Sequence, residues 1–318
     1  MWLFKPKIKR RKEVFELPFN DSKVVERLYL KKELLEAEDS AHKEIRPLLV
    51  ILGGGMVGVG GSAACIALHE LGLGNVFDTT VGISAGACDC AYFLAGKEQM
   101  VLGTSIYHEE LAGRFVKASR RPITDLKYLE SVFREGPKAL DTNVIQRHRS
   151  ELCVVATELQ TKKPAIIDAK TASPDIISTV IASAALPGKL WGRPVEINGK
   201  DYFDGSFGNP FPIELIIEKF DPTDILVIPN RTFDAAFHAK PHLREKIFGR
   251  WIFGDMWYYA KNRHRLYREA FYKLKNIPKI NAGVIWAPHD LSSLEMSADK
   301  IKQLADDMRE KTLSYFAQ

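Results

Sequence analysis

A serine flanked by two glycines is the residue of this sequence whose type and spacing point most directly to chemistry. Gly82, Ser84 and Gly86 have the Gly-x-Ser-x-Gly spacing of a nucleophile elbow. In such an elbow the serine lies at the tip of a tight strand-to-helix turn, where side chains at the glycine positions would clash with neighbouring backbone. The helix that follows directs its N–H groups and its positive dipole end toward a developing oxyanion. Ser84 is therefore the candidate nucleophile of an acyl-ester hydrolase.

A glycine-rich loop at 53–58 precedes the elbow and has two interpretations. Its glycine spacing matches a dinucleotide-binding fingerprint, which requires an acidic residue about 20 positions further on. Asp78 has that separation from Gly58, but it lies near the start of the next predicted strand, where it cannot reach a ribose. The alternative is an oxyanion hole beside Ser84, which the sequence favours because both motifs follow strands of one predicted sheet. Its backbone N–H groups would come from Gly53, Gly54 and Gly55.

A serine nucleophile needs a base, and two residues compete for this role. His289 lies late in the chain, where a Ser–Asp–His hydrolase carries its histidine. Asp204 ends a short apolar stretch and enters a turn rich in Gly, Asn and Pro, where a site residue is expected. An exposed aspartate is a weak base with a pKa near ~3.9, but burial beside the serine would raise that pKa. Residue chemistry alone leaves both candidates open, along with a purely turn-forming role for Asp204.

Four blocks in a fixed order resemble motifs of the patatin-like phospholipase family. The loop at 53–58 resembles the family's oxyanion loop, and the segment 82–86 resembles its nucleophile elbow. The segment 182–187, Ala-Ser-Ala-Ala-Leu-Pro, resembles the Ala-Ser-x-Ala-x-Pro block. Asp204-Gly205 with Asn209-Pro210 resembles the Asp-Gly-Gly/Ala segment. The resemblance covers residues 48–230 well and the C-terminal stretch 288–312 loosely.

This resemblance implies a three-layer α/β/α fold with a mostly parallel central sheet. It also implies a Ser–Asp dyad without histidine, in which Ser84 is the nucleophile and Asp204 the base. The implied substrates are lipid acyl esters, cleaved through an acyl-enzyme with no metal and no cofactor. The remaining motif positions are Gly58, Gly82, Gly86 and Gly205.

Two positions depart from the family pattern. Val57 stands where the family usually has Arg or Lys, and Ser206 stands where it usually has Gly or Ala. Loss of a cation beside the oxyanion loop is expected either to weaken the binding of an anionic headgroup or to change how the loop is held in place. The backbone N–H groups of the loop remain, so we expect activity to survive, whereas the substrate preference stays open.

The elements that position these residues follow from the hydrophobic pattern. The order strand, glycine loop, helix, strand, turn and helix over 48–96 predicts a parallel sheet with crossover helices. We expect a basic N-terminal segment with an amphipathic helix at 1–46, followed by a hydrolase domain at 47–318. Predicted strands cover 48–52, 76–82, 151–157, 164–168 and 225–228. Predicted helices cover 22–45, 62–72, 85–96, 174–186 and 297–316.

Charge and aromatic content suggest where the protein acts. The net charge of +5 is too small to indicate a nucleic-acid partner. Residues 1–12 contain six Lys or Arg, and residues 231–276 combine eleven basic side chains with eleven aromatic ones. This combination suits peripheral contact with an anionic membrane, although a solvated tail and an aromatic core are equally good explanations. A helical stripe in the second segment comprises Phe248, Trp251, Ile252, Met256 and Tyr259.

The cysteines and the length of the apolar runs indicate the cellular compartment in which the protein is expected. The four cysteines form no Cys-x-x-Cys pair, which disfavours a disulfide framework or a zinc site. No run of about 18 apolar residues is present to form a transmembrane helix. The sequence thus predicts a cytoplasmic protein with peripheral membrane contact. Three alternatives remain open at this point: a soluble carboxylesterase or thioesterase with the same dyad, a catalytically idle lipid-binding protein, and a nucleotide-binding protein.

Overall fold

The computed structural model describes residues 19, 21–116, 124–187, 193–238 and 257–317, with backbone only for 238 and 257–261. Within these ranges eight strands form one sheet, in the order β5-β6-β3-β2-β1-β7-β8 with β4 paired to β3. Neighbouring strands run parallel from β3 through β2, β1 and β7 to β8, and β4, β5 and β6 add antiparallel pairs. The strands are β1 Pro47–Ile51, β2 Thr79–Ile83, β3 Glu151–Glu158, β4 Pro164–Asp168, β5 Val195–Ile197, β6 Lys200–Asp204, β7 Asp224–Ile228 and β8 Asn281–Val284.

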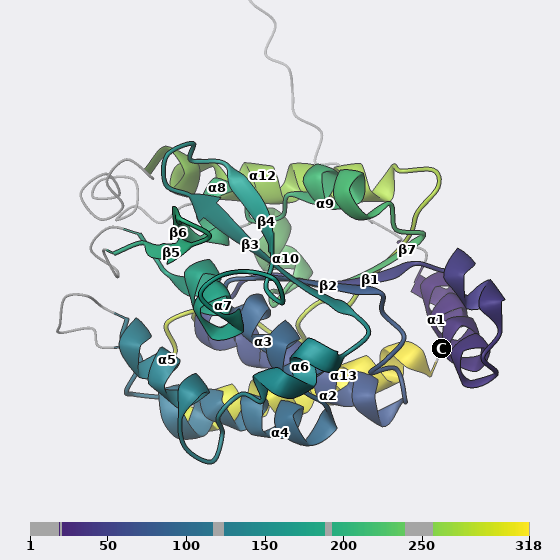
Figure 1. The fold of residues 1–318 in the computed structure, drawn as a ribbon, viewed down its shortest axis with the longest axis horizontal. Coiled ribbons are helices and arrows are strands. Elements are labelled where there is room, and N and C mark those ends of the chain that lie inside the picture. The colour runs from purple at the N-terminus through teal and green to yellow at the C-terminus, as the bar shows by residue number, and fades with distance from the viewer. Residues whose placement is uncertain (1–18, 20, 117–123, 188–192, 239–256, 318) are drawn as a thin grey trace, which may run out of the picture.

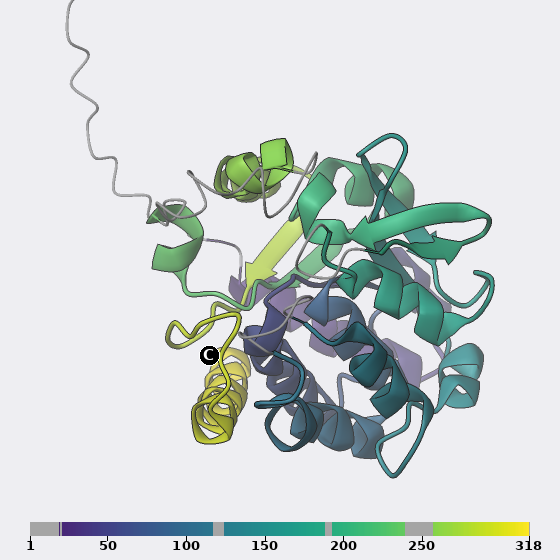
Figure 2. The same cartoon turned by 90° about the vertical axis from the view of Figure 1, so that its left-hand side faces the viewer.

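Helices cover both faces of this sheet, as Figures 1 and 2 show. Below it in Figure 1 lie α2, α3, α4 and α13, and above it lie α9 and α12. The predicted α/β fold, with a mostly parallel central sheet between helical layers, is confirmed. The helices with their bounds are α1 Asp21–Glu36, α2 Val59–Glu70, α3 Ala85–Leu94, α4 Lys97–Ser105, α5 Leu126–Arg134, α6 Thr142–Arg147, α7 Ile176–Ala184, α8 Gly205–Gly208, α9 Ile213–Phe220, α10 Phe233–His238, α12 Trp257–Lys275 and α13 Ala298–Phe316. Single turns or short irregular helices occupy Ser40–Glu44, Gly55–Gly58 and Ile106–Leu111.

Two hydrophobic cores lie on opposite faces of the sheet, and β1 contributes to both. Its five residues are all buried, as expected for a central parallel strand covered on two sides. Successive side chains of a strand point to opposite faces. Leu49 and Ile51 therefore pack with α2, α3 and α13, whereas Leu48 and Val50 pack with α9, α10 and α12. This continuous apolar run explains why the strand could be predicted from sequence.

The N-terminal helix α1 packs onto the edge of the sheet beside β8. Val24 and Leu28 are buried in the core that α2, α3 and α13 form with one face of the sheet. Arg27 forms an ion pair of 2.6 Å with Asp224 at the start of β7. Asp21 accepts hydrogen bonds from the amide of Val284 and the hydroxyl of Tyr315. The predicted boundary between a segment at 1–46 and a domain at 47–318 stays a prediction, and residues 1–18 lie outside the described residues.

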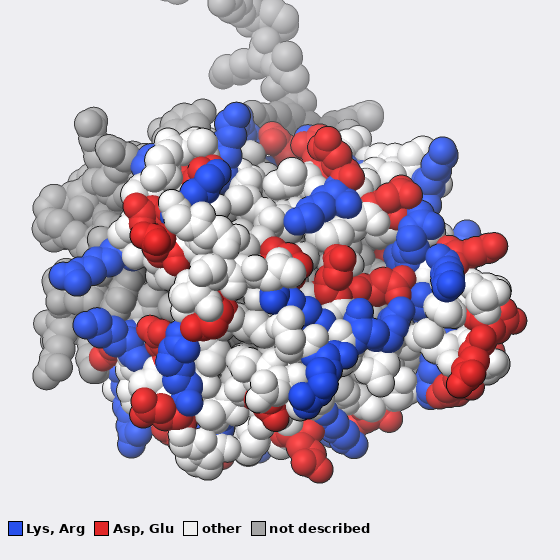
Figure 3. Space-filling view, in the orientation of Figure 1, with Lys and Arg blue, Asp and Glu red and all other residues white. Residues whose placement is uncertain are grey.

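The surface and the thiols complete the description. Figure 3 shows acidic and basic side chains interspersed over the face of the molecule that it presents. All four cysteines are buried free thiols, in line with their placement in predicted helices and strands. Among the described helices, none has the length and apolar character needed to span a bilayer.

Candidate active site

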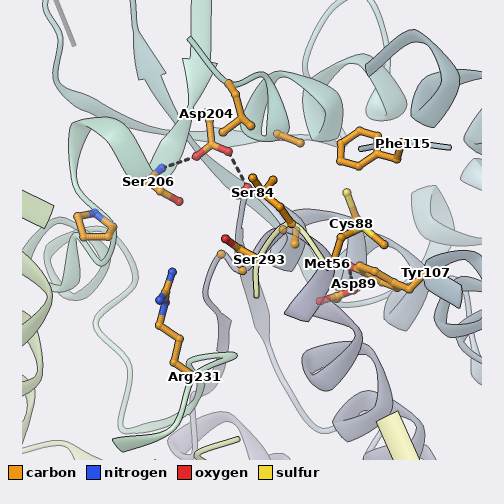
Figure 4. Close-up of a pocket in the computed structure, with 18 of the residues that line it drawn as sticks. Met56, Ser84, Cys88, Asp89, Tyr107, Phe115, Asp204, Ser206, Arg231 and Ser293 are labelled. Carbon is orange, nitrogen blue, oxygen red and sulfur yellow. Dashed lines mark hydrogen bonds between the residues drawn. The ribbon is translucent and has the colours of Figure 1, made fainter. Parts of the chain in front are cut away.

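The pairing of three strands brings Ser84 and Asp204 together. Strand β4 pairs with residues 153–157 of β3, so β2 and β6 must both pair along the other side of β3. The register places Ile83 opposite Val155 and Asp204 opposite Ala156. The residue that follows β2 and the last residue of β6 are consequently neighbours. Ser84 Oγ donates a hydrogen bond of 2.6 Å to Asp204 Oδ2, which Figure 4 shows as a dashed line.

The turn at Ser84 has the geometry of a strained elbow. Ser84 has φ of 55° and ψ of −123°, a backbone conformation that residues other than glycine rarely adopt and that costs about 1–3 kcal/mol. The flanking glycines are required by close packing: a Cβ on Gly86 would lie 2.1 Å from the carbonyl oxygen of Ile51, and one on Gly82 would lie 2.3 Å from Cα of Ala87. The elbow therefore holds the hydroxyl at one fixed position.

Ser183 fixes the elbow from the neighbouring helix α7. Its hydroxyl accepts a hydrogen bond of 2.8 Å from the amide of Ser84 and donates one of 2.6 Å to the carbonyl oxygen of Val155. Ser183 thus joins the nucleophile to the strand that also positions Asp204. The sequence singled out the block at 182–187 only through a resemblance, without giving this serine a role.

Asp204 is a buried carboxyl group with a hydrogen bond to each oxygen. Its side chain accepts from Ser84 and, through Oδ1, from the amide of Ser206 at 2.8 Å, and the residue is 1% exposed. Burial raises the pKa of Asp204 to about 6, and the hydrogen bonds from Ser84 and Ser206 limit that rise. At neutral pH the group is therefore mostly ionised but basic enough to take a proton. Thr157 holds its backbone by donating to the Asp204 carbonyl oxygen at 2.7 Å.

The loop at 53–55 lies directly against the nucleophile. A Cβ on Gly53 would lie 3.1 Å from Cβ of Ser84 and 2.8 Å from Oγ of Ser206, so a side chain here would displace the nucleophile or Ser206. Within the described part of the chain, the amides of Gly53, Gly54 and Gly55 donate no hydrogen bond. These N–H groups are consequently available to a carbonyl oxygen.

Residues at the carboxyl end of β7 and near the C-terminus anchor this loop. Buried Asn230 donates from Nδ2 to the carbonyl oxygen of Leu52 at 2.7 Å and accepts from the amide of Gly61 at 2.6 Å. The amide of Met56 donates to the carbonyl oxygen of Ser293 at 3.0 Å. The loop is held on both sides, so its available N–H groups are fixed before any ligand arrives.

A cavity of about 460 Å³ opens over Ser84 and Asp204, within the range of about 300–1,000 Å³ usual for ligand pockets. Its walls are mainly apolar, with aromatic rings from Tyr92, Tyr107 and Phe133. Basic side chains on the wall include Arg231, and the close-up in Figure 4 shows its guanidinium directed into the pocket. Such a cavity suits a long apolar group attached to a polar or charged one.

A second buried carboxyl group, Asp89, lines the same pocket. It lies on α3, five residues after Ser84, and is 1% exposed. Oδ1 accepts a hydrogen bond of 2.8 Å from the Tyr107 hydroxyl, whereas Oδ2 has no partner among the described residues. Burial raises the pKa of Asp89 well above its usual range and so favours the neutral form of this group. Sequence reasoning missed this group because a single Asp between two cysteines carries no motif.

The other sequence candidates lie apart from the dyad. His289 is 40% exposed and lies 3.4 Å from Asp307, beside a smaller cavity that it lines with Val57. Asp78 forms ion pairs with Lys31 and Arg149 at the amino end of β2, opposite the edge that holds Ser84. Among the described residues, no three His, Cys, Asp or Glu side chains come close enough to share a metal ion.

Comparison with known proteins gives one family match. The Patatin-like phospholipase family model matches residues 49–217, more than half of the chain. Among solved structures, the crystal structure of VipD from Legionella pneumophila is 12% identical, with 82% of this chain and 67% of that chain covered and a TM-score of 0.38. No curated protein has a significantly similar sequence.

Proposed function

The chain belongs to the patatin-like phospholipase family, and on that premise we propose that it is a lipid acyl hydrolase with a Ser84–Asp204 dyad. Its reaction would be of the phospholipase A or lysophospholipase type, a carboxylic ester hydrolysis through an acyl-enzyme. The observation that carries this proposal is the hydrogen bond of 2.6 Å from Ser84 Oγ to a buried carboxylate whose pKa is about 6. An apolar cavity of about 460 Å³ over this pair supports a fatty-acyl substrate.

The first half of the reaction forms the acyl-enzyme. Asp204 Oδ2 takes the proton of Ser84 Oγ as the oxygen attacks the ester carbonyl carbon. The developing oxyanion accepts hydrogen bonds from the available amides of the loop at 53–55. Protonated Asp204 then returns the proton to the departing alcohol or lysolipid, and the acyl group remains on Ser84.

The second half regenerates the enzyme. Asp204 takes a proton from water, and the hydroxide attacks the acyl carbonyl held by the same loop amides. The ester bond to Ser84 breaks, the fatty acid leaves, and Ser84 Oγ recovers the proton from Asp204. One residue serves as base and acid in both halves, which a carboxyl group with a pKa of about 6 does well near neutral pH.

The substrate reaches this pocket from a lipid surface in the proposed function. We place peripheral membrane contact in the segments 1–12 and 231–276, in a cytoplasmic protein. Helices α10 and α12 belong to the second segment, and Tyr272 on α12 is 55% exposed, as suits an interfacial aromatic ring. Residues 1–12 and most of the stripe from Phe248 to Tyr259 lie outside the described residues, and for Tyr259 only the backbone is described.

The test is release of fatty acid from phospholipid vesicles by wild type, Ser84→Ala, Asp204→Asn and His289→Ala. We expect the first two variants to lose activity and the third to keep it, because His289 lies outside the pocket. A folded His289→Ala variant without activity would refute the dyad. Hydrolysis of soluble esters or thioesters with no hydrolysis of vesicles would instead identify a soluble esterase. Labelling of wild type by a fluorophosphonate, absent from Ser84→Ala, would exclude an idle lipid-binding protein.

A further inference from the structure

Arg231 is a half-buried cation without a partner inside the candidate active site. It follows β7 and lines the same pocket as Ser84 and Asp204. Its guanidinium makes no hydrogen bond or ion pair with any described residue, although its backbone carbonyl accepts from the amide of Ala287 at 2.9 Å. A guanidinium that is half removed from water and unpaired is costly unless a ligand supplies the opposite charge.

The order of the strands explains why Arg231 does not pair with the base. Along the carboxyl edge of the sheet, β6 carries Asp204, β2 leads to Ser84, β1 leads to the loop at 53–55, and β7 leads to Arg231. The nucleophile and the loop thus stand between the cation and the carboxylate. The pocket consequently has a base at one side of the reacting carbonyl and a positive charge at the other.

Asp290 lines a smaller adjoining cavity together with Arg231, but its carboxylate accepts a hydrogen bond of 2.8 Å from the Thr232 hydroxyl and forms no ion pair with Arg231. The other carboxyl group on the wall of the larger pocket is Asp89, and burial raises its pKa well above the usual range, which favours its neutral form. Arg263 and His264 also line the larger cavity, each with further interactions of its own. This side of the pocket is therefore suited to an anion.

We infer that Arg231 binds the phosphate of the substrate, so that the enzyme prefers glycerophospholipids over uncharged acyl esters. This inference rests on the proposed function. In a glycerophospholipid the phosphate is only a few bonds from the ester carbonyl, so a carbonyl held at Ser84 places it close by. The planar guanidinium matches a phosphate through two parallel hydrogen bonds.

The position of Arg231 also accounts for the apolar residue at 57. Val57 is buried and packs against Gly54. A Cβ added to Gly54 would lie only 2.8 Å from Cγ2 of Val57. Val57 and Arg231 line one smaller cavity of about 160 Å³. Arg231, which follows β7, is thus a positive charge beside the apolar position 57, in a cavity that His289 and Asp290 also line.

The test compares two substrates that share hexanoyl chains and stay monomeric: dihexanoyl phosphatidylglycerol and uncharged dihexanoylglycerol. The quantity measured is the ratio of kcat/KM for the first to kcat/KM for the second. In Arg231→Ala this ratio should fall about tenfold to hundredfold, as expected for a lost charge-assisted hydrogen bond, and mainly through KM. Arg231→Lys should restore part of it, because the charge returns without the planar fork.

Arg46→Ala is the matched control. Arg46 precedes β1, so it lies at the edge of the sheet away from the pocket, and it pairs with exposed Asp221 at 2.8 Å. Arg46→Ala removes one positive charge, as Arg231→Ala does, and should leave the ratio of the two kcat/KM values at its wild-type level. An unchanged ratio in Arg231→Ala, or an equal fall in Arg46→Ala, would overturn the inference.

Two further outcomes separate the possible failures. Wild-type enzyme that hydrolyses neither ester would refute the proposed function itself, whatever Arg231 does. Inorganic phosphate distinguishes the source of the anion: it should not accelerate hydrolysis of dihexanoylglycerol if the ligand is the lipid headgroup. Acceleration that disappears in Arg231→Ala would make free phosphate the ligand and would overturn the headgroup inference.

Discussion

Asp204 and Asp89 are two carboxyl groups in one pocket with the same burial and different chemistry. Each is 1% exposed, and burial raises the pKa of both. Asp204 accepts a hydrogen bond at each oxygen, which holds its pKa at about 6. Asp89 accepts one bond from Tyr107 and leaves Oδ2 without a described partner, and burial raises its pKa well above the usual range. Burial favours the neutral form of a carboxyl group, and donors directed at its oxygens favour the charged form that can act as a base.

The sharpest way to break this comparison is to remove the proposed dyad. We expect Ser84→Ala and Asp204→Asn each to lower kcat by about 10⁴-fold or more, because nucleophile and base act as a unit. Single-turnover release of fatty acid would measure this loss. Circular dichroism spectra identical to that of the wild type would show that both variants remain folded. An Asp204→Asn variant within tenfold of wild type would mean that another group takes the proton.

The pH dependence of the rate tests the pKa difference directly. The ionised form of Asp204 is the base, so kcat/KM should fall as the pH drops through about 6, and then about tenfold for each further pH unit. Measurement on a monomeric ester between pH 4 and 8 would show one inflection. Asp89→Asn should leave that inflection in place. If the inflection moved with Asp89, the assignment of the base would be wrong.

Stability should depend on pH in the opposite sense to activity. The pKa of Asp204 rises from 3.8 to about 6 on folding, so the folded state holds the proton more tightly. Stability is therefore lost as the pH rises from about 4 to about 6, by about 3 kcal/mol. Asp204→Asn removes this loss, and its free energy of unfolding relative to wild type should increase over that range. Urea titrations at pH 4 and 7 would measure the change, and equal differences at both pH values would contradict it.

The smallest effect on kcat/KM is expected for Asp89→Asn, the substitution of the second buried carboxyl group. Burial raises the pKa of Asp89 and favours its neutral form, which Asn matches in charge and shape, so Asp89→Asn should change kcat/KM less than about threefold. Initial rates of Asp89→Asn and Asp204→Asn, measured side by side at pH 7, would compare the two carboxyl groups under one condition. A loss comparable to that of Asp204→Asn would show that the two carboxyl groups work together.

The parts of the fold that could be predicted are those with a strong local pattern. The strands at 48–52 and 164–168 were expected almost at their observed bounds, because each contains a short apolar run that a predicted strand requires. Strands β5, β6 and β8 were not expected. They have three to five residues, and in β6 only Tyr202 and Phe203 precede Asp204 as an apolar stretch, which is too short to predict a strand.

The site was predictable only where a motif records it. Ser84, Asp204 and the loop at 53–55 were singled out from sequence, and the structure brings them together. Ser183, Asn230 and Arg231 acquire their positions through contacts with residues far away in the chain. Asn230, for example, bonds to Leu52 and Gly61 across more than 160 positions. No local pattern carries such information.

The way in which β3 assembles the dyad has a consequence for engineering. Ser84 and Asp204 are 120 positions apart, yet each is placed by pairing with the same short stretch of β3. The chain between the end of β4 and the start of β5 takes part in neither pairing. Within that interval the carbonyl oxygen of Ala185 accepts a hydrogen bond of 2.8 Å from the amide of Asp204, so the turn after α7 has to keep its length. Insertions before α7, between the end of β4 and Asp175, are accordingly expected to leave the reaction chemistry unchanged.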